Sequence, residues 1–248
     1  MKKPFFAMLA TALLVIWLPA SSSAQLFFDF ENGLALPGYN DVRIPGDTGT
    51  LFSLSEDLTT DSAYFFRVRL GYHWESGHTV SIFAAPLRLN AAGSVDKEVD
   101  FFEETFPPNI PLTGVYEFNS YRLTYRYDLL RRDNLRAGIG FTAKIRDAAI
   151  KIEGGGLSSE KTNVGPVPLI NFSVLWQFHE DWGLLFEGDA AAARQGRAED
   201  ILLALQYRLN DKLTLRAGYR ILEGGSDVEE VYTFALIHFL SAGLTFTF

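Results

Sequence analysis

The four histidines are the residues of this sequence best suited to acid–base chemistry near neutral pH. They are His73, His78, His179 and His238. A serine hydrolase needs a histidine within hydrogen-bond reach of the serine, and a third group that orients it. The nearest pair along the sequence, His78 and Ser81, points to opposite faces of a strand unless a bulge intervenes. We therefore interpret His78 as a solvated turn histidine and expect no enzymatic activity.

Carboxylates offer two further arrangements that could carry chemistry. Glu187 and Asp189 share one face of a segment and could form an acid pair, but the surrounding arginines favour an ion-paired plug. The acidic stretch 96–104 has the oxygen ligands that Ca²⁺ prefers, although its spacing matches no known calcium loop. The sequence contains no cysteine, and hence neither a disulfide nor a thiolate metal site. We expect neither a cofactor nor a bound metal.

Fifteen charged side chains share a position rather than a motif. They stand within segments in which apolar and polar residues alternate, on the polar side of the alternation. The set is Asp29, Glu31, Arg67, Arg69, Arg122, Arg126, Asp128, Arg136, Lys144, Arg146, Glu187, Asp189, Arg208, Arg216 and Arg220. Both signs are represented, and a buried charge is tolerated when it is paired. The sequence therefore predicts an internal charge network.

Ten segments carry this alternation, and a period of two residues is the pattern of a β-strand. Their ranges are 25–36, 63–74, 79–89, 115–129, 135–152, 167–178, 182–193, 200–209, 212–222 and 234–248. Pro86 interrupts the third segment, where we expect a bulge. Long connections, at 38–61, 91–113, 154–166 and 224–230, alternate with short turns. This asymmetry is typical of transmembrane barrels.

Alternation alone does not decide which face lies inside, since a soluble barrel buries its apolar face and a membrane barrel turns it to lipid. Aromatic residues beside the short turns favour lipid, because aromatic girdles mark the membrane boundary. These residues are Trp74, Tyr127, Trp176, Trp182 and Phe248. Beyond residue 24 no run of about 18 apolar residues remains for a spanning helix, so a membrane-embedded chain must form a closed barrel. A soluble β-sandwich or lipocalin-like barrel is the alternative.

Residues 1–24 have the features of a cleaved signal peptide. Lys2 and Lys3 precede an apolar run at residues 5–19 and the small residues 21–24. We expect export, cleavage before Gln25 and one barrel domain over 25–248. The full sequence has a net charge of −8, and without the two lysines of the signal the domain has −10. This acidic balance speaks against nucleic acid as a partner.

The final strand, Phe234 to Phe248, is amphipathic and ends on a phenylalanine two residues after Phe246. This ending resembles the last strand of bacterial outer-membrane β-barrels, and the resemblance to that class extends over the whole mature chain. It implies a place in the outer membrane, contact with its lipid and lipopolysaccharide, and recognition of Phe246 and Phe248 by the barrel-assembly machinery.

Omptin-type proteases within that class resemble this chain in having ten strands. They need an Asp pair and an Asp–His pair at the outer rim. Here three histidines are expected at the periplasmic end and His238 on the lipid face. We therefore assign no omptin site.

The predicted fold is an all-β, antiparallel, up-and-down transmembrane barrel of about ten strands; twelve strands, or eight with rim hairpins, are alternatives. Side chains can fill so small a barrel, so we expect a structural or binding protein with a plugged lumen and with the loops at 38–61 and 91–113 as its interaction surface. In the first loop, Asp41, Arg43, Asp47 and Thr48 are candidates either to pair with lumen charges or to bind an extracellular ligand. A narrow anion-preferring channel is the second hypothesis, and an outer-membrane lipid hydrolase or protease the third.

Overall fold

The computed structural model describes residues 25–248, so the expected signal peptide lies outside the described residues. Within these described residues there is no helix that is long and apolar enough to cross a bilayer. The strands are β1 (Gln25–Arg43), β2 (Phe52–Ser53), β3 (Leu58–Thr60), β4 (Ala63–His73), β5 (His78–Ala85), β6 (Arg88–Gly93), β7 (Val99–Phe101), β8 (Glu104–Phe106), β9 (Leu112–Arg132), β10 (Leu135–Gly154), β11 (Leu157–Gln177), β12 (Trp182–Ala193), β13 (Gly196–Arg208), β14 (Leu213–Val228) and β15 (Val231–Thr247).

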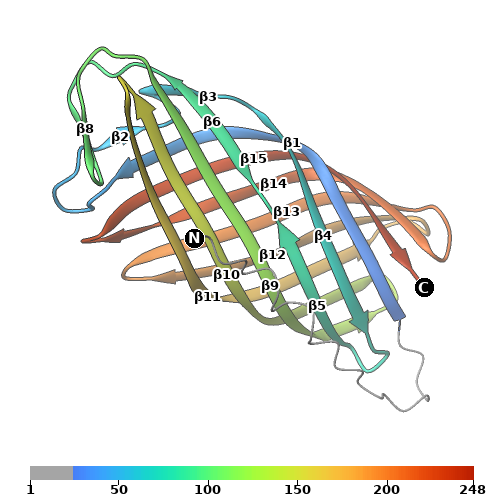
Figure 1. Cartoon of the computed structure of the whole chain (residues 1–248). Coiled ribbons are helices and arrows are strands. Elements are labelled where there is room, and N and C mark those ends of the chain that lie inside the picture. Colours follow the sequence, from blue (N-terminus) through green and yellow to red (C-terminus); the bar gives the residue numbers. More distant parts are fainter. Residues whose placement is uncertain (1–24) are drawn as a thin grey trace, which may run out of the picture.

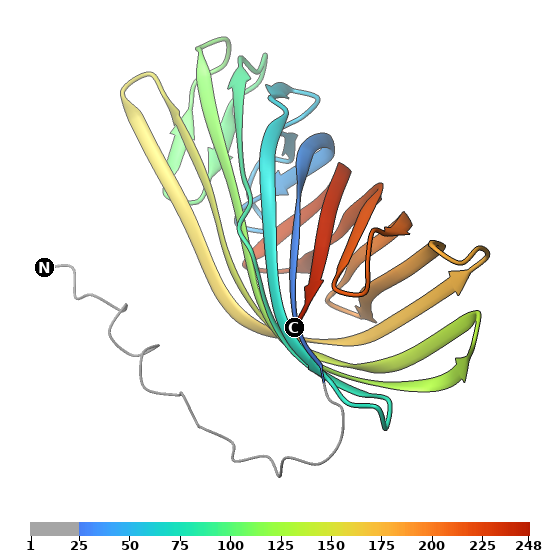
Figure 2. The ribbon, with the colours of Figure 1, turned by 90° about the vertical axis from the view of Figure 1, so that its right-hand side faces the viewer.

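Ten of these strands form a closed antiparallel barrel in the order β1, β4, β5, β9 and then β10 to β15 (Figure 1). The ring closes where β15 pairs with β1, with Phe28 opposite Phe246. In Figure 2 these two strands, red and blue, lie side by side. The prediction of ten strands is confirmed, and the alternatives of eight and twelve are wrong. The second loop does contain a hairpin, β7–β8, but it forms a separate two-stranded sheet.

The barrel has two unlike ends. One carries Gln25, Phe248 and the short turns 74–77, 133–134, 178–181 and 209–212, and we call it the turn end. There the backbone N–H of Phe248 bonds to the carbonyl of Leu26. At the opposite end, the open end, the strands extend well beyond the segments that alternate cleanly.

Two expected loops are strands in the structure. The segment 154–166 is mostly β11, which pairs with β10 as far as Gly154 opposite Leu157, and the segment 224–230 continues β14 to Val228. These predictions were wrong because the hairpins project above the apolar belt. Polar residues occupy both faces there, so the period of two is lost while the backbone pairing continues.

The third expected strand is interrupted at Pro86, as predicted, but without a bulge. Ala85 lies opposite Ser120 on one side of the gap and Arg88 opposite Glu117 on the other, so the register of β5 and β6 against β9 is unchanged. Proline lacks the N–H needed for the ladder, and its effect here is a missing bond. The side chains keep the same inward and outward alternation through the gap.

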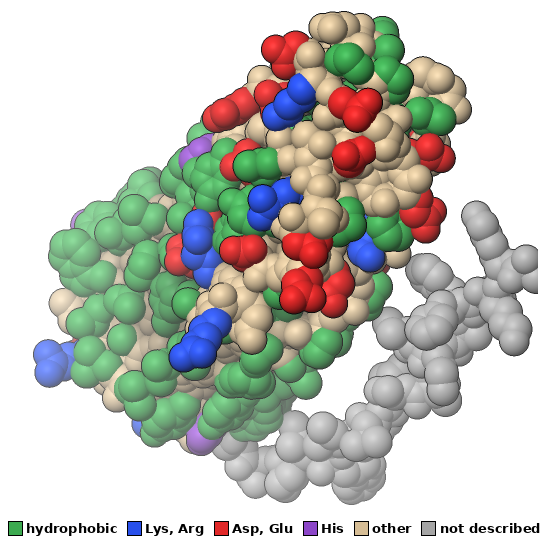
Figure 3. Space-filling view, turned by 90° about the vertical axis from the view of Figure 1, so that its left-hand side faces the viewer, with side chains coloured by type: hydrophobic (Ala, Val, Ile, Leu, Met, Phe, Trp, Pro, Cys, Tyr) green, Lys and Arg blue, Asp and Glu red, His purple; other side chains and the backbone are tan. Residues whose placement is uncertain are grey.

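The outer surface bears the apolar belt that the alternation predicts. Its exposed large side chains include Leu34, Phe66, Ile82, Leu123, Phe141, Ile170, Leu203 and Leu240. In Figure 3 hydrophobic side chains cover the flank of the barrel, and carboxylates gather toward the open end. Many charged residues of the same strands lie on the opposite face and are buried, among them Glu31, Arg67, Arg122 and Asp189. The apolar face is therefore the outer face, which is the arrangement of a transmembrane barrel.

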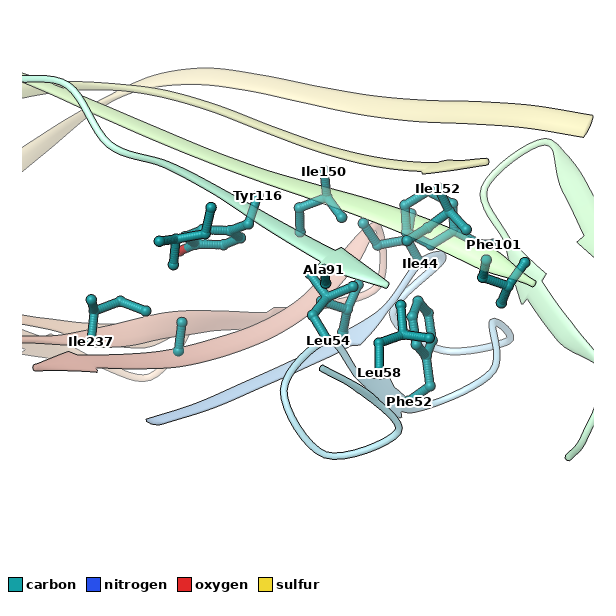
Figure 4. Close-up of a cluster of buried hydrophobic side chains, with 14 of the residues drawn as sticks. Ile44, Phe52, Leu54, Leu58, Ala91, Phe101, Tyr116, Ile150, Ile152 and Ile237 are labelled. Atoms are coloured by element: carbon teal, nitrogen blue, oxygen red, sulfur yellow. The ribbon is translucent and has the colours of Figure 1, made fainter. Parts of the chain in front are cut away.

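The upper part of the interior, beneath the open end, is an apolar plug. Both long loops contribute to it, through Ile44, Phe52, Leu54 and Leu58 of the first and Val95, Val99, Phe101 and Phe106 of the second. These side chains pack against inward-facing residues of β1, β6, β9, β10 and β15, among them Leu89, Tyr116, Ile152 and Ile237 (Figure 4). The first loop thus turns inward, and apolar side chains anchor it.

Candidate functional site

The lumen below the apolar plug is crossed by ion pairs. Arg69 of β4 contacts Glu187 of β12 at 3.2 Å, and these strands lie five places apart in the ring of ten, on opposite sides of the barrel. Arg122 of β9 reaches Asp189 of β12 at 2.6 Å. Each of these bonds fixes the distance between two walls. The barrel therefore has a cross-section set by its internal charges.

Asp200 is the centre of this network. Its carboxylate accepts hydrogen bonds from Arg67 at 2.9 Å, from Arg220 at 2.6 Å and from Arg122. Its side chain is 3% exposed. Sequence reasoning missed Asp200 because it stands at the first position of an expected strand, where a turn residue is ordinary. Its alternation with Leu202 and Ala204 was the signal that could have placed it inside.

Most residues of the predicted charge network do come together in the lumen. Asp29 and Glu31 on β1 both pair with Arg216, and Glu31 also pairs with Arg220 at 2.8 Å. Nearer the turn end Asp128 is buried, with Arg126 at 3.7 Å and the half-exposed Arg136 at 3.6 Å.

The structure places two predicted members elsewhere. Arg208 lies at the turn end beside Asp181, 3.6 Å away and exposed, because it is the last residue of β13. Arg146 lies above the network and donates a hydrogen bond to Asn163. Neither contributes to the cross-lumen pairs.

Little empty space remains around the network. One cavity beside Arg69, Phe83 and Thr124 measures about 30 Å³, and another beside Arg67 and Pro86 about 10 Å³. Either holds at most one or two water molecules. These two cavities are too small to form a wide path along the barrel axis.

Above the network a cleft of about 700 Å³ opens at the open end. Its walls are β10 and β11 on one side and β12 to β15 on the other, and its floor includes Lys144, Leu169, Asp189 and Asp200. This volume lies within the range of small-molecule sites. The loop of residues 38–61 contributes only Ile44 to the lining.

The cleft exists because the barrel wall parts between β11 and β12. These strands pair only from Ile170 opposite Ala190 down to Gln177 opposite Gly183. Above Ile170, β11 carries Pro166 and Pro168, which have no N–H to offer a neighbour and are typical of edge strands. In Figure 1 the β10–β11 and β12–β13 hairpins end far apart. The upper part of β11 is therefore a free edge.

On the far wall a polar cluster is fully paired. Arg197 binds both carboxylate oxygens of Glu223, at 2.7 and 3.0 Å, and the hydroxyl of Tyr39 donates to the same carboxylate. Burial, together with the hydrogen bond to Glu223, raises the pKa of Tyr39 above its usual value. The hydrogen bonds that Arg197 donates to Glu223 in turn raise the pKa of Arg197.

The four candidates in the first loop do not join the charge network. Asp41 and Arg43 belong to β1, and Asp47 and Thr48 are exposed at the open end. Arg43 lies over the ring of Tyr232, 5.0 Å from its centroid, and among the described residues it forms no ion pair. The expectation that this loop plugs the barrel through charges is thus corrected, because its apolar residues carry the plug.

The histidines lie away from the cleft. The ring of His73 bonds to Thr79 and that of His78 to Tyr125, each at 2.8 Å, near the turn end. His179 is in the turn 178–181, and His238 contacts Tyr219 on the outer face. Within residues 25–248 no histidine lines the cleft, and no cluster of three metal-binding side chains is found.

The architecture is similar to that of solved outer-membrane barrels. The outer-membrane protease OmpT from Escherichia coli has a TM-score of 0.58 and 9% sequence identity, over 90% of this chain and 97% of that chain. The transport unit of the autotransporter AIDA-I from Escherichia coli has a TM-score of 0.45 and 9% identity, over 97% and 95%. The attachment invasion locus protein Ail of Yersinia pestis has 0.38 and 12%, over 90% and 98%.

Sequence comparison adds no closer relative, since no protein-family model and no curated protein matches the chain. At the identity that OmpT shows, likeness extends to the fold alone. The chain therefore has the fold of the bacterial outer-membrane β-barrels.

Proposed function

We propose that this chain is a small outer-membrane barrel of the binding type, which holds a ligand in the cleft at its open end. The cleft of about 700 Å³ carries the proposal. The expected interaction surface, the loops at 38–61 and 91–113, has most of its large apolar side chains buried in the plug. The surface that remains available to a ligand is therefore that of the upper hairpins, which form the walls of the cleft.

The proposal includes the orientation and the assembly of the barrel. The turn end, with its short turns, faces the periplasm, and the open end faces outward, as in outer-membrane barrels generally. The belt contacts outer-membrane lipid and lipopolysaccharide. The strand β15, which carries Phe246 and is followed by the exposed Phe248, is the segment that the assembly machinery recognises after export through a cleaved signal peptide.

The ion pairs that cross the lumen support binding over conduction. Ion pairs connect β4 and β9 with β12 and β13 across the barrel. Planar-bilayer recordings of the refolded mature chain in molar salt test this point. We expect no discrete current steps from protein whose folding is verified by its heat-dependent gel shift. Stable steps with anion preference would establish the narrow channel instead.

The histidine positions support binding over hydrolysis. OmpT is a protease. In the protein described here, no histidine of residues 25–248 lines the cleft. A Ser–His or Asp–His arrangement is therefore missing among the cleft-lining residues, and a general base of that kind is not in reach of a substrate.

The binding test uses ¹⁹F NMR with a panel of neutral, anionic and cationic fluorinated fragments in nanodiscs. Ala191 is half-buried in the cleft wall, and Ala191→Trp fills it. Ala143 points to the lipid face, so Ala143→Trp is the matched control. We expect at least one class of fragment to bind wild type and Ala143→Trp but not Ala191→Trp. Equal binding by all three proteins, or by none, would refute a ligand site in the cleft.

A further inference from the structure

Lys144 differs from every other charged residue buried in the described chain. The buried arginines and carboxylates of the lumen all have an oppositely charged partner within 4.0 Å, whereas the ammonium of Lys144 has none and its side chain forms no hydrogen bond within the described residues. Its side chain is nevertheless only 3% exposed. A buried charge without a partner lowers the stability of the fold. Its presence here therefore suggests a function that offsets this cost.

The neighbours of Lys144 increase this cost. In the β9–β10 ladder it stands directly opposite Arg122, and like charges in that position repel each other. The carboxylates within reach of Arg122, those of Asp189 and Asp200, are bound to arginines. The ammonium of Lys144 rests 4.5 Å from the centroid of the Phe118 ring, which offers only a cation–π contact.

Lys144 forms part of the cleft floor, and Phe118 lines the cleft beside it. The position that a carboxylate partner would occupy is therefore open to whatever enters the cleft. The walls above contribute mainly apolar side chains, including Ile150, Val231 and Ile237. Between β11 and β12 the wall is open above Ile170, beside the upper edge of the apolar belt.

We infer that Lys144 binds the anionic head group of an amphipathic ligand whose apolar chain lies against the cleft walls. This inference rests on the proposed function and names the ligand class of the same site. A carboxylate and a phosphate share the required chemistry, because both accept a charge-assisted hydrogen bond from an ammonium. The anionic head group is the missing partner of Lys144, and the opening between β11 and β12 accommodates the apolar chain of the ligand.

The test is calorimetric titration of octanoate, with 1-octanol as the neutral probe of equal chain length. The mature chain is used in phosphatidylcholine nanodiscs, and heats from empty discs are subtracted. We expect wild type to bind octanoate at least about tenfold more tightly than 1-octanol, as a desolvated charge pair allows. Lys144→Met should remove this preference, and Lys144→Arg should retain it.

Lys161→Met is the matched control, because Lys161 also lines the cleft but is only half-buried and stacks on Phe102 at 4.5 Å. It should change octanoate affinity by less than about threefold. If both probes bind wild type equally and Ala191→Trp abolishes both, the cleft is a ligand site but the inference about Lys144 is wrong. If neither probe binds, the inference is wrong, and the fragment panel still tests the cleft.

Stability separates a ligand-binding role from a structural one. Without ligand, the urea midpoint of Lys144→Met should be no lower than that of wild type, because an unpaired buried cation is removed. A lower midpoint together with unchanged octanoate affinity would overturn the inference. If Lys144→Met fails to refold, Lys144→Gln serves in both measurements.

A phosphatidylglycerol arm identifies the source of the anion. If nanodiscs of this lipid weaken octanoate binding to wild type but not to Lys144→Met, a membrane phosphate competes for the site. If they do not, the anion comes from solution. Either result supports the inference, provided that the preference for octanoate over 1-octanol depends on Lys144.

Discussion

Arg67 and Asp200 lie 133 residues apart in the sequence, yet the guanidinium Nη1 of one and the carboxylate Oδ2 of the other are 2.9 Å apart across the lumen. Both side chains are almost completely buried. The guanidinium of Arg67 also lies 4.9 Å from the centroid of the Phe239 ring, which belongs to the apolar plug. This pair therefore joins the charged part of the interior to the apolar part.

Replacing Asp200 with asparagine should destabilise the barrel strongly. The substitution removes the shared carboxylate of Arg67, Arg122 and Arg220 and leaves buried cations under-compensated. The expected loss is about 3–5 kcal/mol in the free energy of unfolding. Urea titration in lipid vesicles, followed by tryptophan fluorescence, measures it.

Asp181→Asn is the control for this change. Asp181 lies 3.6 Å from Arg208 at the turn end, and both side chains are exposed. Loss of such a pair costs about 0–1 kcal/mol. Comparable losses at positions 181 and 200 would show that the cross-lumen network does not hold the barrel together.

The long-range pairs of this network could not be predicted from sequence. Alternation placed Arg67 and Arg122 on the inner face, since each strand has a side toward lipid and a side away from it. Which carboxylate each one meets depends on the order and tilt of the strands in the closed ring. Asp200 has partners on β4, β9 and β14, and no local pattern encodes that convergence.

The cleft likewise could not be predicted from the alternation of apolar and polar residues. Its walls are the upper hairpins, where residues such as Lys161 and Glu199 face water or the cleft and hydropathy no longer alternates. The segment 154–166 was therefore predicted to be a loop, although its backbone pairs with β10 from Leu157 onward. Pro166 and Pro168 are typical of an edge strand. They indicate an opening in the barrel wall only once the structure shows that the pairing of β11 with β12 ends at Ile170 and Ala190.

Shortening a plug residue should release the first loop without unfolding the barrel. Leu54 is 1% exposed, and Leu54→Ala leaves a cavity that costs about 2–5 kcal/mol. Since this core lies above the charge network, in the upper part of the interior, the loss should appear as local opening. Proteinase K digestion of vesicle-embedded protein should cut near residues 50–62 faster than in wild type.

Leu51→Ala makes the same chemical change three residues earlier, where the side chain is 47% exposed. Its digestion should follow that of wild type. Equal sensitivity of the two variants would mean that the apolar residues of this loop do not anchor it.

The Tyr39 cluster predicts a measurable titration. Because the folded-state pKa of Tyr39 is raised, its contribution to stability is present below the ordinary tyrosine pKa of about 10 and is lost as pH rises through the folded value. Glu223→Gln removes the charged acceptor and should lower this pKa. Arg197→Gln removes a neighbouring cation and should raise it.

NMR of ¹³Cζ-labelled tyrosine follows these titrations, and Tyr39→Phe assigns the resonance among the 10 tyrosines. A pKa that moves in the same direction in both variants would contradict the cluster, since Glu223 and Arg197 act on the phenol with opposite sign.

Arginine substitutions at two depths of one strand test the outer belt. Leu205 faces outward within β13, between Leu184 and Ala217 of the adjacent strands, whereas Leu209 follows the end of β13 at the turn end. Arginine near the middle of the bilayer costs about 2–4 kcal/mol, and near the interface about 0–1 kcal/mol. Leu205→Arg should therefore lower the free energy of unfolding in vesicles much more than Leu209→Arg.

The same substitutions should have similar, small effects in detergent micelles, whose apolar layer adapts to the added charge. A large loss at Leu209 with tolerance at Leu205 would place the belt at the turn end and contradict the position of Leu205 within the bilayer.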